Sequence, residues 1–365
     1  SSTKSSGAGL WKITESTDAN AAVKASLSGT SQIATFTLSN SNVGTVYVYD
    51  QAGNCATVTL TTDSTKPVVD STTPTYSQGK YTIKITDGES GLWKVANTSG
   101  TALANGDYSS SNYPTSQKTF TGTGPVEKIR VYNGVSQYTE VALDNTKPEA
   151  SGFYNGTKIK VTASDSGSKL WKVATSTGGS NIASSSFSGS SSKTEVITNG
   201  ASKVYVYDHA GNYKEVTLTE DKTGPTYETP TYSQGTYTIK VTDTGSGLWK
   251  IADTSGNALT NGTYSSYPTA QQAFTGTGPV AKIKLYDALG NATEVTLDNT
   301  KPTIQRKYKN GANALVEATD TGSGLWKITE SVGGNAIVTL SGTTQVAKFT
   351  LSSSSVTTVY VYDHA

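Results

Sequence analysis

The sequence predicts an all-β protein built from a tandem array of antiparallel β-sandwich domains, arranged as an elongated rod. Three observations predict this fold: an internal repeat of about 80 residues, apolar residues that alternate with polar ones, and a low hydrophobic content of 34%. Low hydrophobicity is also typical of disorder, but 21 Tyr, five Trp and regular β-branched runs argue against it. Several small domains with thin cores therefore fit the composition best.

The repeat is marked by three motifs. The Trp of each "LWK" triplet falls at 11, 93, 171, 249 and 326, so successive spacings are 82, 78, 78 and 77. A "VYVYD"-like segment follows each triplet, and "TKP" or "TGP" closes each of the first four repeats. The predicted domains are 1–66 (expected to lack its opening segment), 67–147, 148–224, 225–301 and 302–365 (expected to lack its closing segment).

Short strands are predicted within each repeat because apolar side chains recur at every second position. In "YTIKITD" (81–87), Tyr81, Ile83 and Ile85 point to one face, while Thr82 and Lys84 point to the other. Gly, Ser, Asn and Pro separate such segments, and no stretch has a helical period. We expect about seven antiparallel strands per domain.

Tight turns are predicted at the "YDHAGN" segments. The Asp208 side chain can accept backbone N–H groups across the turn, and Gly211 can supply the positive φ that closes it. Repeat two has Asn133-Gly134 with no following Gly-Asn, so we expect a different turn there.

These motifs together resemble a known family. The pattern D-x-G-S-G-L-W-K-[IV], then V-Y-[VL]-Y-D-x-A-G-N, then T-K-P is similar to bacterial immunoglobulin-like repeats, which occur in tandem on cell-surface proteins and adhesins. The resemblance covers nearly the whole chain. It implies immunoglobulin-like sandwiches, a bacterial extracellular location, and a role as stalk or fibre, with neighbouring repeats as the main partners.

Composition argues against several other classes of function. A formal net charge of +1 with interspersed charges gives no basic stripe for nucleic acid, and no apolar run is long enough for membrane insertion. The two histidines, His209 and His364, occupy the same slot of two repeats, and no Ser/His/Asp arrangement or phosphate loop is visible. We expect no enzyme and no organic cofactor.

Five recurring tryptophans are predicted to build the cores. Alternation places each on the same face as the aliphatic residue two positions later, as with Trp249 and Ile251. The alternative is that they are exposed platforms on which sugars stack. The five residues are Trp11, Trp93, Trp171, Trp249 and Trp326.

Acidic residues are predicted to gather where domains meet, because the linker and two loops of a sandwich share one pole. Hard oxygen ligands there could bind Ca²⁺, although Lys66, Lys147, Lys222 and Lys301 of the linkers could neutralise the carboxylates instead. The Ca²⁺ candidates are Asp144, Asp165, Asp208, Asp221, Asp243, Asp287, Asp298, Asp320 and Asp363.

Three roles follow from this sequence. The first is a structural stalk or fibre segment. The second is an adhesin module that binds host glycan or protein through repeated weak sites. The third is a filament subunit that is completed by strand addition from other copies. Cys55, the single cysteine, could pair with another chain.

Overall fold

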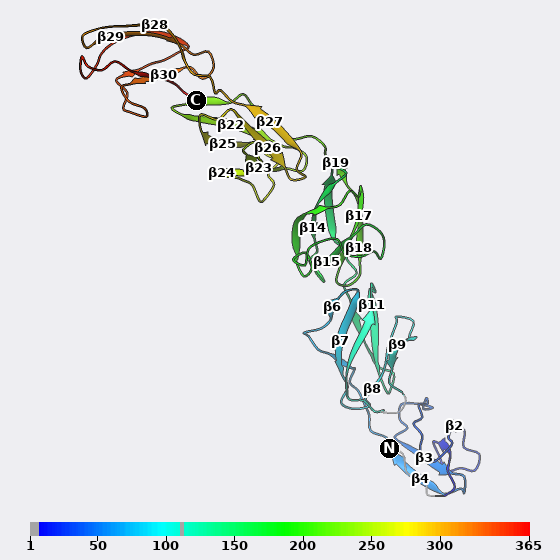
Figure 1. Cartoon of the computed structure of the whole chain (residues 1–365). Coiled ribbons are helices and arrows are strands. Elements are labelled where there is room, and N and C mark those ends of the chain that lie inside the picture. Colours follow the sequence, from blue (N-terminus) through cyan, green and yellow to red (C-terminus); the bar gives the residue numbers. More distant parts are fainter. Residues whose placement is uncertain (1–6, 110–112) are drawn as a thin grey trace. The chain divides into compact units, whose positions relative to one another are not determined.

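The structure, a computed structural model, describes residues 7–109 and 113–365 (Figure 1). In these ranges every regular element is a β-strand and no helix occurs, so the all-β prediction is confirmed. Most strand pairs are antiparallel, whereas β13 (Glu149–Tyr154) and β19 (Thr219–Glu220) form a parallel pair. The described ranges accordingly contain no apolar helix of membrane-spanning length.

The chain divides into two compact units. The first contains Ser1–Lys147, Ser166–Trp171 and Tyr207–Asn212. The second contains Pro148–Asp165, Lys172–Val206 and Tyr213–Ala365. This division differs from the five sequence repeats, so the predicted domain boundaries stay predictions.

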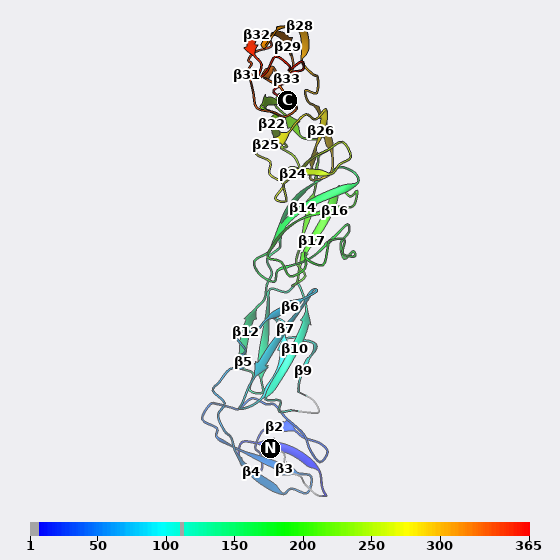
Figure 2. The same ribbon diagram turned by 60° about the vertical axis from the view of Figure 1, so that its left-hand side comes forward.

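The strands of the first two repeats form three sheets. One has the order β2-β1-β3-β4, and another has the order β12-β11-β8-β9. In the third sheet, β7 lies between β10 and β5 (Figure 2), and β6 also pairs with β7. The strands are β1 (Leu10–Thr14), β2 (Val23–Ser26), β3 (Thr45–Asp50), β4 (Cys55–Thr59), β5 (Val68–Val69), β6 (Thr75–Ser77), β7 (Lys80–Thr86), β8 (Leu92–Ala96), β9 (Ala102–Asp107), β10 (Gln117–Thr123), β11 (Lys128–Asn133) and β12 (Tyr138–Ala142).

The third and fourth repeats form two sheets each. Their orders are β16-β14-β13-β19 with β15-β17-β18, and β20-β22-β21 (β25 also pairs with β22) with β24-β23-β26-β27. The further strands are β14 (Lys158–Ser164), β15 (Leu170–Ala174), β16 (Ser192–Thr198), β17 (Lys203–Asp208), β18 (Tyr213–Thr217), β20 (Thr226–Tyr227), β21 (Thr231–Ser233), β22 (Thr236–Thr242), β23 (Leu248–Ala252), β24 (Ala258–Thr263), β25 (Gln272–Thr277), β26 (Lys282–Asp287) and β27 (Ala292–Thr296).

The last repeat also has two sheets, with the orders β28-β29-β32 and β31-β30-β33. Its strands are β28 (Thr303–Asn310), β29 (Asn313–Thr319), β30 (Leu325–Thr329), β31 (Val338–Thr339), β32 (Thr344–Thr350) and β33 (Tyr360–Asp363).

Pairs of sheets enclose shared cores. In the second repeat, Ile83 of β7 packs in one buried cluster with Val95 of β8 and Val131 of β11, which belong to the other sheet. In the fourth repeat, Ile239 of β22 and Leu285 of β26 do the same across two sheets. Buried side chains from two sheets thus pack against each other, which is consistent with a β-sandwich.

The tryptophans do not form these cores, contrary to the prediction. Trp11 is 43% exposed, and the other four are only half-buried. In each "LWK" strand the buried residues are instead the Leu before the Trp and the aliphatic residue two positions after it, as with Leu248 and Ile251, both 0% exposed. The reason is a bulge: the pairing register shifts between Leu248 and Lys250, and an extra residue in one strand reverses the alternation of faces. The same shift occurs in the first and fifth repeats.

The predicted turns are confirmed where they carry "AGN". Gly211 has a φ of 97°, and the Asn212 N–H donates to Asp208 Oδ1 at 2.9 Å. In repeat two, the positive φ is instead at Ser136, at 64°, as the different sequence there predicted. These turns hold the acidic side chains at the ends of the strands.

Candidate functional site

Three predicted Ca²⁺ candidates meet at the start of the fourth repeat. Asp221 lies in the linker after β19, Asp243 follows β22 directly, and Asp287 is the last residue of β26. One carboxylate oxygen of each lies within 4.8 Å of the others. The side chains are 7%, 5% and 0% exposed. Their predicted proximity is confirmed, and the linker and two loops share one pole here.

Backbone and amide groups hold this acidic set in place. The Ser246 N–H donates to Asp221 Oδ2 at 2.7 Å, and the Gly247 N–H donates to Asp243 Oδ1 at 2.6 Å. Asn291 Nδ2 donates to Asp287 Oδ2 at 2.5 Å. Such bonds favour the ionised carboxylates, while their burial opposes ionisation.

Electrostatic strain is largest at Asp287. Burial, together with the nearby charges of Asp221 and Asp243, raises the pKa of Asp287 to about 6, although Asn291 hydrogen bonds work in the opposite direction. Burial also raises the pKa of Asp243. Three buried carboxylates within 4.8 Å therefore need a compensating positive charge.

Lys160 lies near enough for the charges of these three carboxylates to act on its pKa, although in the described ranges no ion pair joins it to them. It lies on β14 of the preceding repeat, is 9% exposed, and its Nζ donates to the Ser246 carbonyl at 2.5 Å. Burial lowers the pKa of Lys160, whereas the charges of Asp243, Asp221 and Asp287 act to raise it. No sequence signal marks this residue, because alternation along "KIKV" only places it outside the core of its own repeat.

In the second unit the linker lysines do not form ion pairs with the clustered carboxylates. Lys222 forms an ion pair with Glu220, and Lys301 is exposed. In the described ranges, neither forms an ion pair with the acidic sets at the starts of the fourth and fifth repeats. The expectation that these two lysines neutralise the carboxylates is therefore wrong.

A second acidic set lies at the start of the fifth repeat. Asp298, Asp320 and Asp363 also place one carboxylate oxygen each within 4.8 Å of the others. Asp298 accepts the Ser323 N–H at 2.7 Å and both the N–H and hydroxyl of Thr300. Burial works against ionisation of Asp298, but these bonds outweigh it and the pKa is lowered.

The remaining candidates are divided between the two units. Asp144 and Asp208 belong to the first unit and Asp165 to the second. Within the first unit, Asp144 Oδ2 accepts the Ser168 N–H at 2.7 Å, and Asp208 Oδ2 accepts from Asn212 Nδ2 at 2.8 Å. Asp165 is 5% exposed.

The first unit also contains a related cluster, in which one of the three Asp positions is occupied by Asn. Asn133 takes the place of the third Asp, and its Nδ2 donates to Asp63 Oδ2 at 3.1 Å. Burial opposes ionisation of Asp63, but hydrogen bonds led by that from Ser90 lower its pKa to about 2. The Asn133 amide thus donates a hydrogen bond where an Asp would repel, while a hydrogen bond with Asp63 raises the pKa of the neighbouring Glu89.

The outward tryptophans form a recurring aromatic and cationic arrangement. Trp249 meets Tyr286 edge-on at 6.3 Å between ring centroids, and Lys250 Nζ lies 4.4 Å from the Trp249 ring centroid. The same lysine donates to the Gly256 carbonyl at 2.6 Å. Since Trp and Tyr with a neighbouring Lys recur in the first and fifth repeats, this arrangement is a feature of the repeat.

Both histidines have backbone partners. The Gln78 N–H donates to His209 Nδ1 at 3.1 Å, and the Gln234 N–H donates to His364 Nδ1 at 3.0 Å. His364 also stacks on Trp326 with ring centroids 6.3 Å apart. Burial lowers the pKa of His209, which favours the neutral ring that accepts the Gln78 N–H. These are the contacts of a structural histidine.

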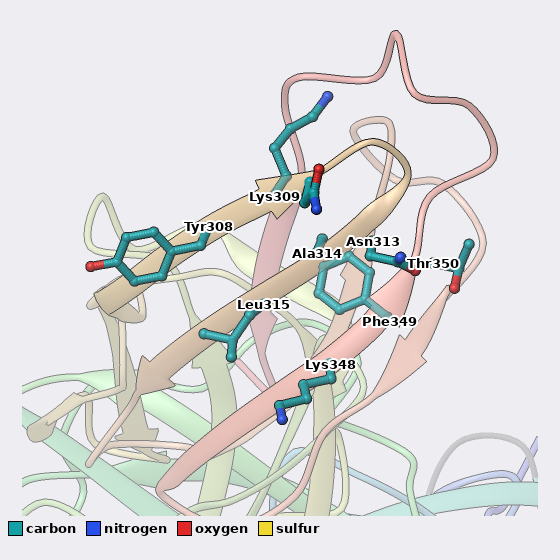
Figure 3. Close-up of a pocket in the computed structure, with 9 residues that line it drawn as sticks. Tyr308, Lys309, Asn313, Ala314, Leu315, Lys348, Phe349 and Thr350 are labelled. Atoms are coloured by element: carbon teal, nitrogen blue, oxygen red, sulfur yellow. The ribbon is translucent and has the colours of Figure 1, made fainter.

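An apolar groove lies along the sheet of the fifth repeat (Figure 3). Tyr308 of β28, Leu315 of β29 and Phe349 of β32 line it, together with Lys309 and Lys348. All eight residues of β28 are exposed, and within the described ranges this strand pairs only with β29. The groove therefore adjoins a free sheet edge.

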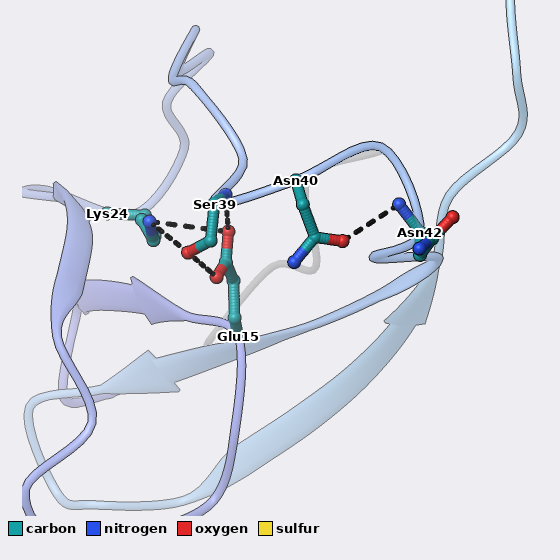
Figure 4. A network of polar contacts seen from close by, with 5 residues as sticks. All are labelled: Glu15, Lys24, Ser39, Asn40 and Asn42. Atoms are coloured by element: carbon teal, nitrogen blue, oxygen red, sulfur yellow. Dashed lines mark hydrogen bonds and ion pairs between the residues drawn. The ribbon is translucent and has the colours of Figure 1, made fainter.

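A polar network in the first repeat also recurs (Figure 4). Glu15 accepts the Ser39 N–H at 2.7 Å and pairs with Lys24 at 3.4 Å. In the fifth repeat, Glu330 accepts the Ser352 N–H at 2.6 Å in the same way. We interpret the network as a loop anchor of the repeat.

No protein-family model and no curated protein matches this chain. Among solved structures, it is similar to the sialic acid binding region of a Streptococcus sanguinis SK1 adhesin bound to 3'sLn. The identity is 11%, the match covers 70% of this chain and 93% of that chain, and the TM-score is 0.19. At that score the likeness carries no argument about the fold or ligands of this chain.

Proposed function

We propose that this chain is a stalk or fibre segment of a bacterial cell-surface protein, built from tandem immunoglobulin-like domains. The observation that carries this proposal is the way each linker bonds to the repeat that follows it. Asp221 Oδ2 accepts the Ser246 N–H, and Asp298 Oδ2 accepts the Ser323 N–H, both at 2.7 Å. A linker that is bonded to the next domain resists bending.

Two further contacts support stiff linkers. The Asp298 N–H donates to the Tyr232 hydroxyl at 2.8 Å, which ties the linker back to the fourth repeat. The Gly235 N–H donates to the His364 carbonyl at 3.0 Å, which joins a hairpin of the fourth repeat to a loop of the fifth. Proline after each linker, as at Pro302, fixes φ and limits hinge motion.

This proposed role is not catalytic, and its partners are neighbouring repeats. The histidines support it, since both accept backbone N–H groups through Nδ1. Small-angle scattering of the whole chain tests the proposal. A stalk segment gives an elongated particle, and a compact particle contradicts it.

An adhesin module that binds host glycan is a second candidate. The half-buried Trp249, with Tyr286 and Lys250 beside it, favours this role because sugars stack on exposed aromatic rings. A glycan array gives the test. Binding that Trp249→Ala abolishes without unfolding the chain supports an adhesin, and absence of binding to any glycan counts against it.

Self-assembly by strand addition is a third candidate, favoured by the exposed edge strand β28. The occupant of this edge would be a second copy of the chain. Sedimentation velocity at rising concentration gives the test. Association that Tyr308→Pro weakens supports it, whereas a monomer at every concentration excludes it.

A further inference from the structure

We propose that Asp298, Asp320 and Asp363 bind a hard divalent cation, Ca²⁺, and that the Lys160 ammonium replaces such a cation at Asp221, Asp243 and Asp287. The two acidic sets are built alike. Each combines a linker Asp, the Asp after the strand that precedes "LWK", and the Asp that ends the strand of the "VYVYD" marker. They differ in the charge that balances them.

The set in the fifth repeat has no ammonium group. The strand of the fourth repeat that precedes "LWK", β22, carries a single lysine, Lys240, and this pairs with Glu228 at the surface, at 3.3 Å. Lys301 of the linker is exposed. In the described ranges neither acidic set forms an ion pair with a Lys or Arg. The Lys160 charge acts to lower the pKa of Asp243, whereas no lysine charge is among the causes that shift the pKa of Asp298, Asp320 or Asp363.

An unpartnered buried oxygen gives independent support for a ligand. Asp320 is 5% exposed, and its Oδ1 accepts the Gly322 N–H at 3.1 Å. Its Oδ2 is buried and has no hydrogen-bond partner. A buried carboxylate oxygen without a partner is strongly unfavourable, so a group that supplies positive charge belongs there.

The neighbouring groups add to the negative charge. Burial raises the pKa of Asp320, and the charge of Asp298 raises it further. Burial also raises the pKa of Asp363, with the charges of Asp320 and Asp298 adding to it. His364 offsets only part of this, and its Nδ1 already accepts the Gln234 N–H.

The donor set fits Ca²⁺. Three carboxylates offer six oxygens, and those that accept one N–H retain a second lone pair. Asp363 Oδ1 accepts the Ala365 N–H at 3.0 Å, and Asp298 Oδ2 accepts the Ser323 N–H at 2.7 Å. Ca²⁺ takes 6–8 oxygen ligands in flexible geometry, so these carboxylates and a few waters complete its shell.

Calorimetric Ca²⁺ titration of the whole chain, freed of metal with EGTA, tests both halves of the proposal. We expect Asp320→Asn to bind one Ca²⁺ fewer than the unmodified chain. The matched variant Asp243→Asn should bind the same number as the unmodified chain, because Lys160 excludes Ca²⁺ from that set. No Ca²⁺ binding by the unmodified chain, or an Asp320→Asn chain that binds the same number, overturns the site.

A gain of binding gives a readout that does not depend on a damaged site. We expect Lys160→Met to bind one Ca²⁺ more than the unmodified chain, because it frees Asp221, Asp243 and Asp287. If Lys160→Met binds no more Ca²⁺ than the unmodified chain, the proposal that Lys160 replaces a cation is overturned. If Asp320→Asn does not fold by near-ultraviolet circular dichroism, the loss is measured with Asp298→Asn and judged by the same outcomes. Neither result depends on the proposed stalk role.

Discussion

Lys160 Nζ donates a hydrogen bond to the Ser246 carbonyl at 2.5 Å, across 86 residues of sequence. This contact holds the Lys160 ammonium group near Asp243, Asp221 and Asp287, whose charges act to raise its pKa while burial lowers it. It joins the third repeat to the fourth. We therefore expect the stability of the second unit to depend more on Lys160 than on a surface lysine such as Lys240.

We expect Lys160→Ala to destabilise the second unit by about 3 kcal/mol, because removal of one partner leaves buried charges uncompensated. Chemical unfolding in urea measures this change. Lys240→Ala is the matched control, since Lys240 pairs with Glu228 at the surface and should contribute less than about 1 kcal/mol. Equal effects of the two substitutions would contradict the role of Lys160.

We expect protonation of Asp287 to contribute to the pH dependence of the free energy of unfolding. Burial raises its pKa to about 6, above the value of about 3.9 in an unfolded chain. The folded state therefore gains a proton at higher pH than the unfolded state, and this group's contribution to stability increases as pH falls from 7 to 5. We expect an increase of about 1 kcal/mol, which Asp287→Asn removes.

Calorimetric melting of both chains at pH 7 and pH 5 measures that difference. The comparison isolates Asp287 from the other carboxyl groups, which titrate in both chains. An Asp287→Asn chain with the same pH dependence as the unmodified chain would show that Asp287 titrates normally.

The bulge at Trp249 predicts an unusual order of mutational effects. Ile251 is fully buried, so Ile251→Ala should destabilise by about 3 kcal/mol. Trp249→Ala removes only its contacts with Tyr286 and Lys250, and should destabilise by about 1 kcal/mol. Urea unfolding ranks the two variants. A larger destabilisation by Trp249→Ala than by Ile251→Ala would show that Trp249 is a core residue.

The strands also show how far the sequence could predict the fold. Alternation correctly placed Ile83 and Ile85 in a core, because regular strands keep period two. It failed at Trp249 because a bulge inserts one residue, and no local pattern marks the shift.

The candidate site was predictable in part for a similar reason. Asp221 lies in a linker, Asp243 follows a strand and Asp287 ends one, so the topology of a sandwich brings them to one pole. Lys160 comes from the preceding repeat, and its approach to Ser246 depends on how two repeats pack. Alternation within one strand holds no information about that packing.

Cys55 is exposed and free, which predicts ready chemical modification. We expect one thiol per chain to react with Ellman's reagent without denaturant, and Cys55→Ser to abolish the reaction. A disulfide-linked dimer under oxidising conditions would show that the same side chain can join two copies. A thiol that reacts only after unfolding would contradict its exposure.

Small-angle X-ray scattering of the chain in solution tests the central claim, that tandem domains form a stiff stalk. Domains of roughly 35–40 Å each predict a rod near 180 Å long, with a radius of gyration of about 50 Å. A single compact globule of 365 residues would have a radius of gyration of about 21 Å. A value near 50 Å supports the stalk, and a value near 21 Å contradicts it.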